Sequence, residues 1–242
     1  MSKLKLDEIH ATKIDGTTKG FPGTSQPMRL DQIGTKNWHV LEQDLPFPVA
    51  ILKDSALRNN SKQMKGFLRA MGVSLSPHGK TTMSPQLFNR QMADGAWGLT
   101  AATTAHVNVY RQAGVQRIVL ANQLVGVQNV AYIARELRAD PEFEFYCLAD
   151  SLQQADQLAE LARHIAAQQD VFCLAGIEVF EAIYGGEPND AANKTEGLLE
   201  QAVMLAEECD DADLFGAPDL LLTAGGTMYF ARAARALLRA CP

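Results

Sequence analysis

Short apolar runs alternate with amphipathic stretches along most of the chain beyond residue 44. Each run has the length and composition of a buried strand, and in the stretches that follow apolar residues recur at helical spacing. The predicted strands cover residues 48–53, 73–76, 97–102, 117–122, 144–150, 174–182 and 219–226. The predicted helices cover residues 55–71, 84–95, 103–114, 126–139, 150–167 and 194–209, with a last one ending near Arg239.

Residues suited to helix ends support these boundaries. Ser84 is a suitable N-cap, Pro85 then occupies the first helical position, and Gly95 closes the same helix. Thr103 or Thr104 opens the next helix.

Continuous apolar strands separated by helices predict an α/β protein with a parallel sheet covered on both faces. Right-handed crossovers can close such a sheet into a TIM-type barrel. A complete barrel has eight strands, and this pattern supplies seven. An open doubly wound sheet is the alternative, but it favours a G-x-G-x-x-G turn after the first strand, where this chain has "DSALRNN". We therefore predict an incomplete barrel over residues 45–242, preceded by an irregular extension over residues 1–44.

Composition excludes several classes of partner. The chain has 242 residues, 47% of them hydrophobic, and a formal net charge of -6 without a basic cluster, which argues against nucleic-acid binding. No run approaches the ~18 apolar residues of a membrane span, and the first residues lack a secretory leader. The four cysteines stand far apart and indicate reduced thiols. We expect a soluble, cytoplasmic protein with no membrane partner.

The stretch "PHGKTTM" places Lys80 just beyond the second predicted strand. Reactive groups of barrels lie at the C-terminal ends of strands and in the loops that follow. The neutral amine of a lysine forms a Schiff base with an aldehyde, and His78 is close enough to orient it. A solvated loop lysine is the alternative interpretation.

The stretch "LLTAGGTMYF" ends the last predicted strand in two glycines, Gly225 and Gly226, followed by Thr227. Small residues at the start of a helix let backbone N–H groups approach phosphate oxygens. Two glycines in an ordinary tight turn are the alternative.

Weaker candidates lie at other strand ends, each with a structural role as the alternative. Tyr184 could pack on a cofactor or contact its phosphate, and Gln123 could line the pocket. Further pocket candidates are Asn122, Thr100, Thr103, Glu178 and Glu181, whereas His106, His164 and Asp150 are expected to be structural.

Five stretches in order resemble the D-serine dehydratase and D-threonine aldolase family, in particular its amino acid deaminase branch. They are "FPVAILKDSALRNN", "PHGKTTM", "GAWGLTAAT", "ANQLVG" and "EFYCLADS", and the resemblance resumes at Gly176 and Thr223. It implies a fold-type III enzyme with a barrel like that of alanine racemase, followed by a β-domain. It also implies that Lys80 holds pyridoxal 5'-phosphate and moves the Cα proton of the substrate.

Two parts of the family pattern have no counterpart in this sequence. The resemblance implies a further strand and helix between Ala167 and Ala175, and a β-domain that would follow "LLRACP". In relatives that β-domain carries a His and a Cys or Asp that bind Zn²⁺ or Mn²⁺, so we place no metal ligand in this chain. A fragment of a longer chain and an internally deleted paralogue both account for the pattern.

The resemblance predicts a pyridoxal-phosphate-dependent lyase that deaminates D-serine or D-threonine, and that forms a homodimer. Retro-aldol cleavage of D-threonine is the first alternative, because it begins from the same cofactor-bound substrate. A protein that binds the cofactor without turnover, and a barrel that binds no cofactor, are the remaining alternatives.

Overall fold

The structure is a computed structural model that describes residues 4–151, 173–184, 187–217, 219–226 and 228–238. The chain divides into two compact units. The first comprises Met1–Lys65 and Ser76–Ile118, and the second comprises Gly66–Leu75 and Val119–Pro242. The predicted division at residue 44 stays a prediction.

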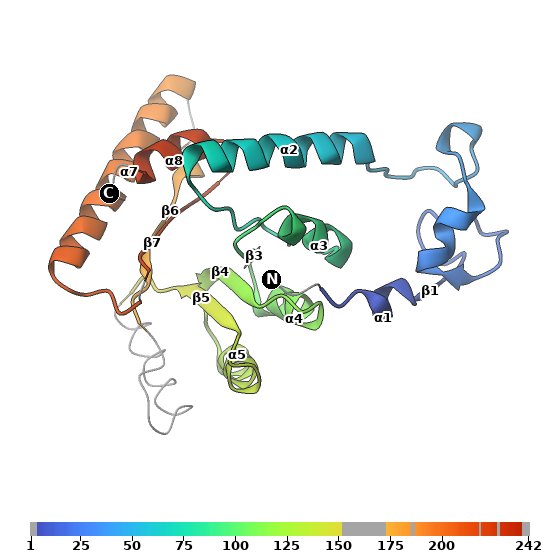
Figure 1. The fold of residues 1–242 in the computed structure, drawn as a ribbon, viewed down its shortest axis with the longest axis horizontal. Coiled ribbons are helices and arrows are strands. Elements are labelled where there is room, and N and C mark those ends of the chain that lie inside the picture. The colour runs from blue at the N-terminus through green and yellow to red at the C-terminus, as the bar shows by residue number, and fades with distance from the viewer. Residues whose placement is uncertain (1–3, 152–172, 185–186, 218, 227, 239–242) are drawn as a thin grey trace. The chain divides into compact units, whose positions relative to one another are not determined.

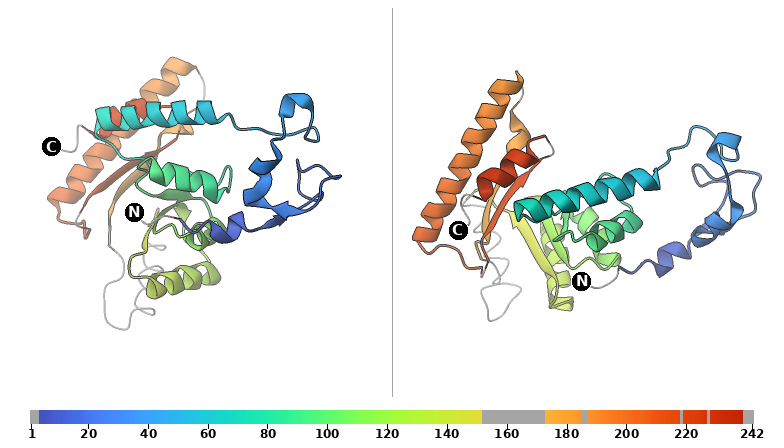
Figure 2. Two further views of the ribbon diagram at one scale, coloured as in Figure 1. Left: turned by 45° about the vertical axis from the view of Figure 1, so that its right-hand side comes forward. Right: turned by 45° about the horizontal axis from the view of Figure 1, so that its top comes forward.

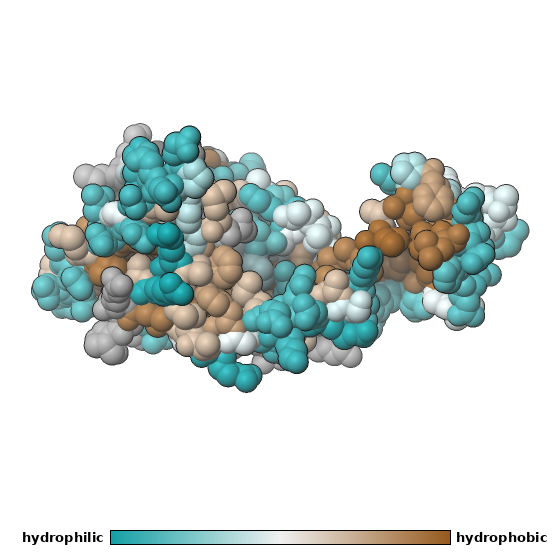
Figure 3. Space-filling model, turned by 90° about the horizontal axis from the view of Figure 1, so that it is seen from above, coloured by the Kyte–Doolittle hydropathy of each residue, from teal (hydrophilic) through white to brown (hydrophobic). Residues whose placement is uncertain are grey.

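The N-terminal segment of the first unit contains short elements where the sequence indicated none. These are α1 (Asp7–His10), β1 (Lys13–Ile14), β2 (Met28–Arg29), η1 (Leu30–Lys36) and η2 (Val40–Glu42). Strands β1 and β2 pair antiparallel, and Phe21 packs edge-on against Trp38 with ring centroids 5.4 Å apart. Figure 3 shows apolar surface over this N-terminal part, where Leu41 is exposed.

The rest of the first unit is built on a buried apolar core. Its elements are the start of α2 (Asp54–Met71), α3 (Pro85–Ala93), β3 (Leu99–Ala101) and α4 (Thr104–Gln112). Phe88 of α3 and Tyr110 of α4 are fully buried and meet edge to face at 4.9 Å between centroids. Leu99 of β3 and Val107 of α4 are also fully buried.

Two predicted strands are wrong. Residues 48–53 form no strand, and Ile51 and Leu52 are exposed there. Residues 73–76 form no strand either, and the adjoining chain makes only an isolated parallel bridge between His78 and Thr100. An apolar run becomes a strand only when another backbone pairs with it, and a single sequence does not reveal that partner.

The next elements are β4 (Arg117–Gln123), α5 (Val127–Ala139) and β5 (Glu144–Leu148), as the sequence predicts. The strands are hydrogen-bonded in the order β3-β4-β5, and the boundary between the two units falls within β4. The helix predicted over residues 150–167 lies outside the described residues, apart from its first two positions.

The second unit ends in a β–α–β–α segment (Figure 1). It consists of β6 (Gly176–Phe180), η3 (Glu181–Ile183), α7 (Pro188–Asp211), β7 (Leu221–Gly225) and α8 (Phe230–Leu237). Strands β6 and β7 are parallel, with Glu178 opposite Thr223 and Phe180 opposite Gly225. Helices α7 and α8 pack against these strands and against each other, as Figure 2 also shows. Helix α7 begins earlier than predicted because Pro188 suits the first turn of a helix.

The α/β class is therefore confirmed, while closure into a barrel stays a prediction. Within the described residues five strands, β3 to β7, follow the predicted alternation with helices, in place of the seven expected. None of the helices in this part of the chain combines the length and hydrophobicity needed to cross a bilayer.

Thiol labelling tests the core of the second unit. Burial raises the pKa of Cys147 in β5 to about 11, whereas Cys173 is exposed and free. Because the thiolate is the reactive form, we expect a disulfide reagent to modify Cys147 at least ~100-fold more slowly than Cys173 at neutral pH. Mass mapping of the labelled peptides measures both rates. A Cys173→Ser variant serves as the control that removes the fast reaction, and equal native rates would contradict the described burial.

Candidate functional site

Lys80 lies in a turn between the bridge to β3 and helix α3. Two backbone hydrogen bonds fix the chain just before it: Thr100 N–H donates to the Pro77 carbonyl at 2.9 Å, and Gly79 N–H donates to the Thr100 carbonyl at 3.1 Å. The Thr100 hydroxyl also donates to the Ser76 carbonyl at 2.7 Å. These bonds hold the loop against β3, and the Lys80 side chain is exposed.

Gly79, the residue before Lys80, is buried, and its surroundings leave no room for a side chain. A Cβ atom on Gly79 would lie 2.6 Å from the Tyr110 hydroxyl and 2.8 Å from Cε1 of Phe88. The Tyr110 hydroxyl in turn donates to the Thr100 carbonyl at 3.3 Å, and burial raises the pKa of Tyr110 to about 12. The core of the first unit therefore determines where Lys80 emerges.

His78 is the neighbour that the sequence assigned to Lys80. Partial desolvation lowers the pKa of His78, and the positive charges of Lys80 and His106 lower it further. The ring is therefore held in its neutral form at neutral pH, where it can accept or donate a hydrogen bond. Both predicted catalytic residues thus belong to the first unit.

The two glycines predicted to cradle phosphate lie at the end of β7, in the second unit. Gly225 is the last residue of the strand, and Gly226 follows it at φ +143°, a backbone conformation that favours glycine. Two carboxyl groups from the neighbouring strand end, those of Glu178 and Glu181, lie against them. Thr227 lies outside the described residues.

The remaining cofactor candidates also belong to the second unit. Gln123 ends β4, and its side-chain amide donates to the Asp150 carboxylate at 2.5 Å. Tyr184 follows η3 and is half-buried. A hydrogen bond and the charge of Asp190 raise the pKa of Lys194, and Tyr184 adds a smaller contribution. The described contacts neither assign nor exclude a ligand role for either residue.

Three of the weaker candidates form local hydrogen bonds, and their part in a ligand site stays a prediction. The Thr103 hydroxyl accepts from His106 N–H at 3.3 Å and caps α4 as predicted, while His106 Nδ1 accepts from Ala102 N–H. The Asn122 side chain accepts the backbone N–H of Gln123 at 2.9 Å. His164 lies outside the described residues.

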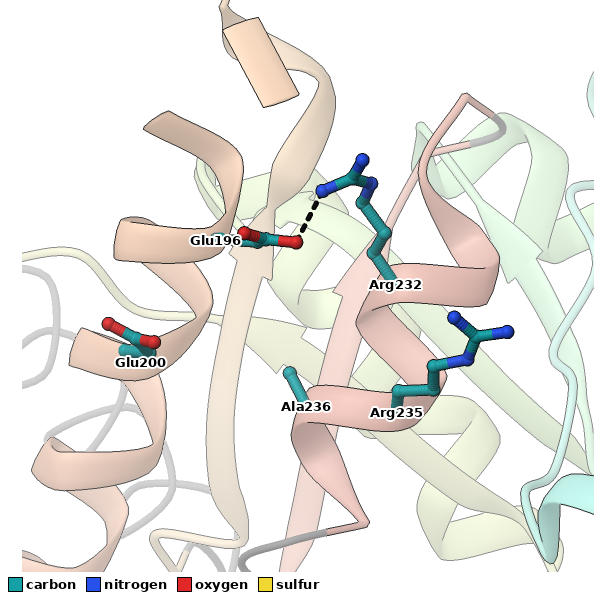
Figure 4. A pocket seen from close by; sticks show the side chains of 5 residues that line it. All are labelled: Glu196, Glu200, Arg232, Arg235 and Ala236. Atoms are coloured by element: carbon teal, nitrogen blue, oxygen red, sulfur yellow. Dashed lines mark hydrogen bonds and ion pairs between the residues drawn. The ribbon is translucent and has the colours of Figure 1, made fainter. Parts of the chain in front are cut away.

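A hollow of about 360 Å³ lies between α7 and α8 (Figure 4). Its lining residues are Glu196, Glu200, Arg232, Arg235 and Ala236. Arg232 and Glu196 form an ion pair across it. The hollow contains none of the predicted site residues, and its charged groups are exposed, so it is distinct from the candidate site.

The described residues contain no group of three or more His, Cys, Asp or Glu side chains placed to hold a metal ion. The sequence assigned no metal ligand to this chain, and that assignment stays a prediction.

Comparison with known proteins first defines the fold class. No protein-family model matches the sequence. The structure resembles two solved α/β enzymes, each over 80% of its own length. The TM-scores are 0.66 for the first of these enzymes and 0.56 for the second.

The first is D-threonine aldolase from Filomicrobium marinum, 20% identical, of which 60% is covered. The second is D-threo-3-hydroxyaspartate dehydratase from Delftia sp. HT23, also 20% identical, of which 57% is covered. In sequence, a D-threonine aldolase from Arthrobacter sp is 25% identical over 124 residues, which are 51% of this chain and 32% of that protein.

The resemblance predicted from the motifs is thus confirmed for D-threonine aldolase, whose α/β fold this chain shares. The amino acid deaminase branch stays a prediction. The chain spans about a third of the curated relative's length and at most 60% of these solved structures.

Proposed function

We propose that this chain is the cofactor-binding part of a pyridoxal-phosphate-dependent lyase that acts on β-hydroxy D-amino acids. Deamination of D-serine or D-threonine to a 2-oxo acid and ammonia is the leading reaction. The observation that supports this most directly is the placement of Lys80: an exposed lysine on a loop fixed by the core, in a chain whose fold resembles D-threonine aldolase.

Each unit, taken by itself, contains a group whose chemistry suits such a cofactor. Lys80 would hold its aldehyde carbon covalently, because an exposed amine on a fixed loop is open to attack a carbonyl. Gly225 and Gly226 would face its phosphate, because glycine lets backbone approach an anion closely. When bound, the cofactor supplies an electron sink for the carbanion formed at Cα.

The chain's own groups supply proton transfer and orientation. Once free, the Lys80 amine is the group that would remove and return the Cα proton. Neutral His78 would orient that amine by a hydrogen bond without adding a second positive charge beside it.

D-threonine aldolase activity is the second candidate, and the relatives found in both sequence and structure favour it. Lys80 and His78 would serve retro-aldol cleavage equally, since both reactions share the same attachment of substrate and differ in the bond that breaks. Cofactor binding without turnover is the third, because the chain spans only part of its relatives.

Chemical trapping tests the proposal. The chain is incubated with pyridoxal 5'-phosphate, reduced with borohydride and digested, and the peptides are mapped by mass spectrometry. We expect one modified residue, Lys80. Adducts spread over several exposed lysines, or none, would overturn the proposal. Assays of ammonia, 2-oxo acid and glycine with D-serine and D-threonine then separate deaminase, aldolase and carrier.

A further inference from the structure

Glu181, the first residue of η3, is a fully buried carboxyl group without a hydrogen-bond partner in the described structure. Its backbone is well held, since the Thr195 hydroxyl of α7 lies 3.1 Å from the Glu181 carbonyl. Its side chain is fully buried, and neither carboxyl oxygen has a hydrogen-bond partner in the described structure. A buried polar group in this state is rare and calls for a functional explanation.

The carboxyl group of Glu181 packs directly against Gly226. Its carbon and both oxygens occupy the space where a side chain on Gly226 would begin. Gly226 itself is exposed to solvent. Glu178 makes a similar contact one residue earlier, with Oε1 3.3 Å from where a Cβ on Gly225 would be. Both carboxyl groups thus lie directly beside the turn at which an anion would bind.

Burial raises the pKa of Glu181, its own backbone N–H offsets part of that rise, and no basic side chain is among the causes of the shift. From α7 the neutral Thr195 reaches the Glu181 backbone carbonyl, and beyond the end of β7 Gly226 meets the Glu181 carboxyl. Glu178 of β6 is the titratable neighbour, and the arginines of α8 line the hollow with Glu196.

Ionisation is consequently unfavourable for both carboxyl groups. Burial raises the pKa of Glu181, and burial followed by repulsion from Glu181 raises the pKa of Glu178. A carboxyl with a raised pKa stays protonated above the ordinary range and becomes negative only as the pH rises through its folded value.

We infer that Glu181 is a positioning residue that couples anion binding at the Gly225–Gly226 turn to a proton: the turn accepts a phosphate group on its exposed side while Glu181 is neutral and rejects it when Glu181 is negative. The inference deepens the proposed function and rests on it for the phosphate-bearing cofactor. By linkage, a bound phosphate also favours the protonated form of Glu181.

The experiment measures the affinity of the wild-type chain and of Glu181→Gln for inorganic phosphate and for pyridoxal 5'-phosphate between about pH 5.5 and about pH 9. Glutamine keeps the size of the side chain and carries no charge at any pH. Because titration of the ligand is common to both chains, the ratio of their affinities isolates Glu181. We expect a ratio near one at the acidic end and binding at least ~10-fold tighter in Glu181→Gln at the alkaline end.

Glu178→Gln is the comparison variant: it neutralises the carboxyl beside Gly225 but leaves Glu181 against Gly226, so phosphate affinity is expected to remain pH-dependent. Melting curves at the acidic end verify that both variants fold. Pyridoxal, which lacks the phosphate, is expected to show no difference between the wild-type chain and Glu181→Gln.

Parallel pH profiles for the wild type and Glu181→Gln would overturn the inference, as would no binding of phosphate at any pH. If Glu178→Gln lost the pH dependence of phosphate binding, Glu178 and not Glu181 would be the carboxyl that couples binding to a proton. Failure of the proposed function looks different: no adduct at Lys80, whatever the behaviour of phosphate. An adduct at Lys80 together with parallel pH profiles for the wild type and Glu181→Gln would contradict only the role of Glu181.

Discussion

A Lys80→Ala chain is expected to form no covalent adduct with pyridoxal 5'-phosphate and to lose the colour that the bound cofactor gives the wild type. The amine is both the attachment point and the proposed proton carrier, so any lyase activity is expected to fall by at least ~10³-fold. Absorption spectra, borohydride trapping and product assays measure these losses. Since Lys80 is exposed, the change in folding stability is expected to stay within about 0.5 kcal/mol.

Lys62→Ala is the matched control for this result. Lys62 is an exposed lysine in α2, so its removal is expected to leave the adduct, the spectrum and the activity unchanged. An adduct that persists in Lys80→Ala on another side chain would show that the proposed attachment point is wrong.

A Gly79→Ala chain is expected to lose about 2 kcal/mol of unfolding free energy. The added methyl group would approach the Tyr110 hydroxyl and the Phe88 ring within 2.6 Å and 2.8 Å, and both rings are fully buried, so neither moves without disturbing the core. Denaturant unfolding measures the loss. Because the same loop carries Lys80, yield of the trapped adduct is expected to fall as well.

Gly66→Ala is the control in which the same substitution is made where there is room for the added methyl group. Gly66 lies within α2 and a Cβ there would meet nothing within 4 Å, so alanine is expected to stabilise the helix by up to about 1 kcal/mol. Unchanged stability in Gly79→Ala would mean that the loop does not pack on the Phe88–Tyr110 pair as described.

The sequence was a good guide where an apolar run and its partner strand are both present. β4 and β5 were predicted closely because their neighbours follow at short distances along the chain. The runs 48–53 and 73–76 have equally apolar residues but lack a paired strand in the described structure, and hydrophobicity alone does not distinguish the two cases. Helix α7 was predicted late because the polar residues of its first turn hide the start at Pro188.

The candidate site was predicted only in part. Lys80 was proposed from its motif and the family resemblance, and Gly225 and Gly226 from the strand-to-helix turn, and their roles stay predictions. The need for Gly79 was missed, since it arises from Tyr110 and Phe88, whose contacts with the loop appear only after folding. The burial of Glu181 was equally hidden, because its carboxyl packs against Gly226, which lies far along the chain, just beyond the end of β7.

The Thr100 carbonyl accepts hydrogen bonds from both Gly79 N–H and the Tyr110 hydroxyl, so one peptide group joins a loop, a strand and a helix. All three belong to the first unit. The loops that follow β6 and β7 belong to the second unit, so sequence variation there is expected to leave the anchoring of the Lys80 loop intact. Variation at Tyr110 would instead remove one of the two hydrogen bonds to the Thr100 carbonyl and so disturb that anchoring.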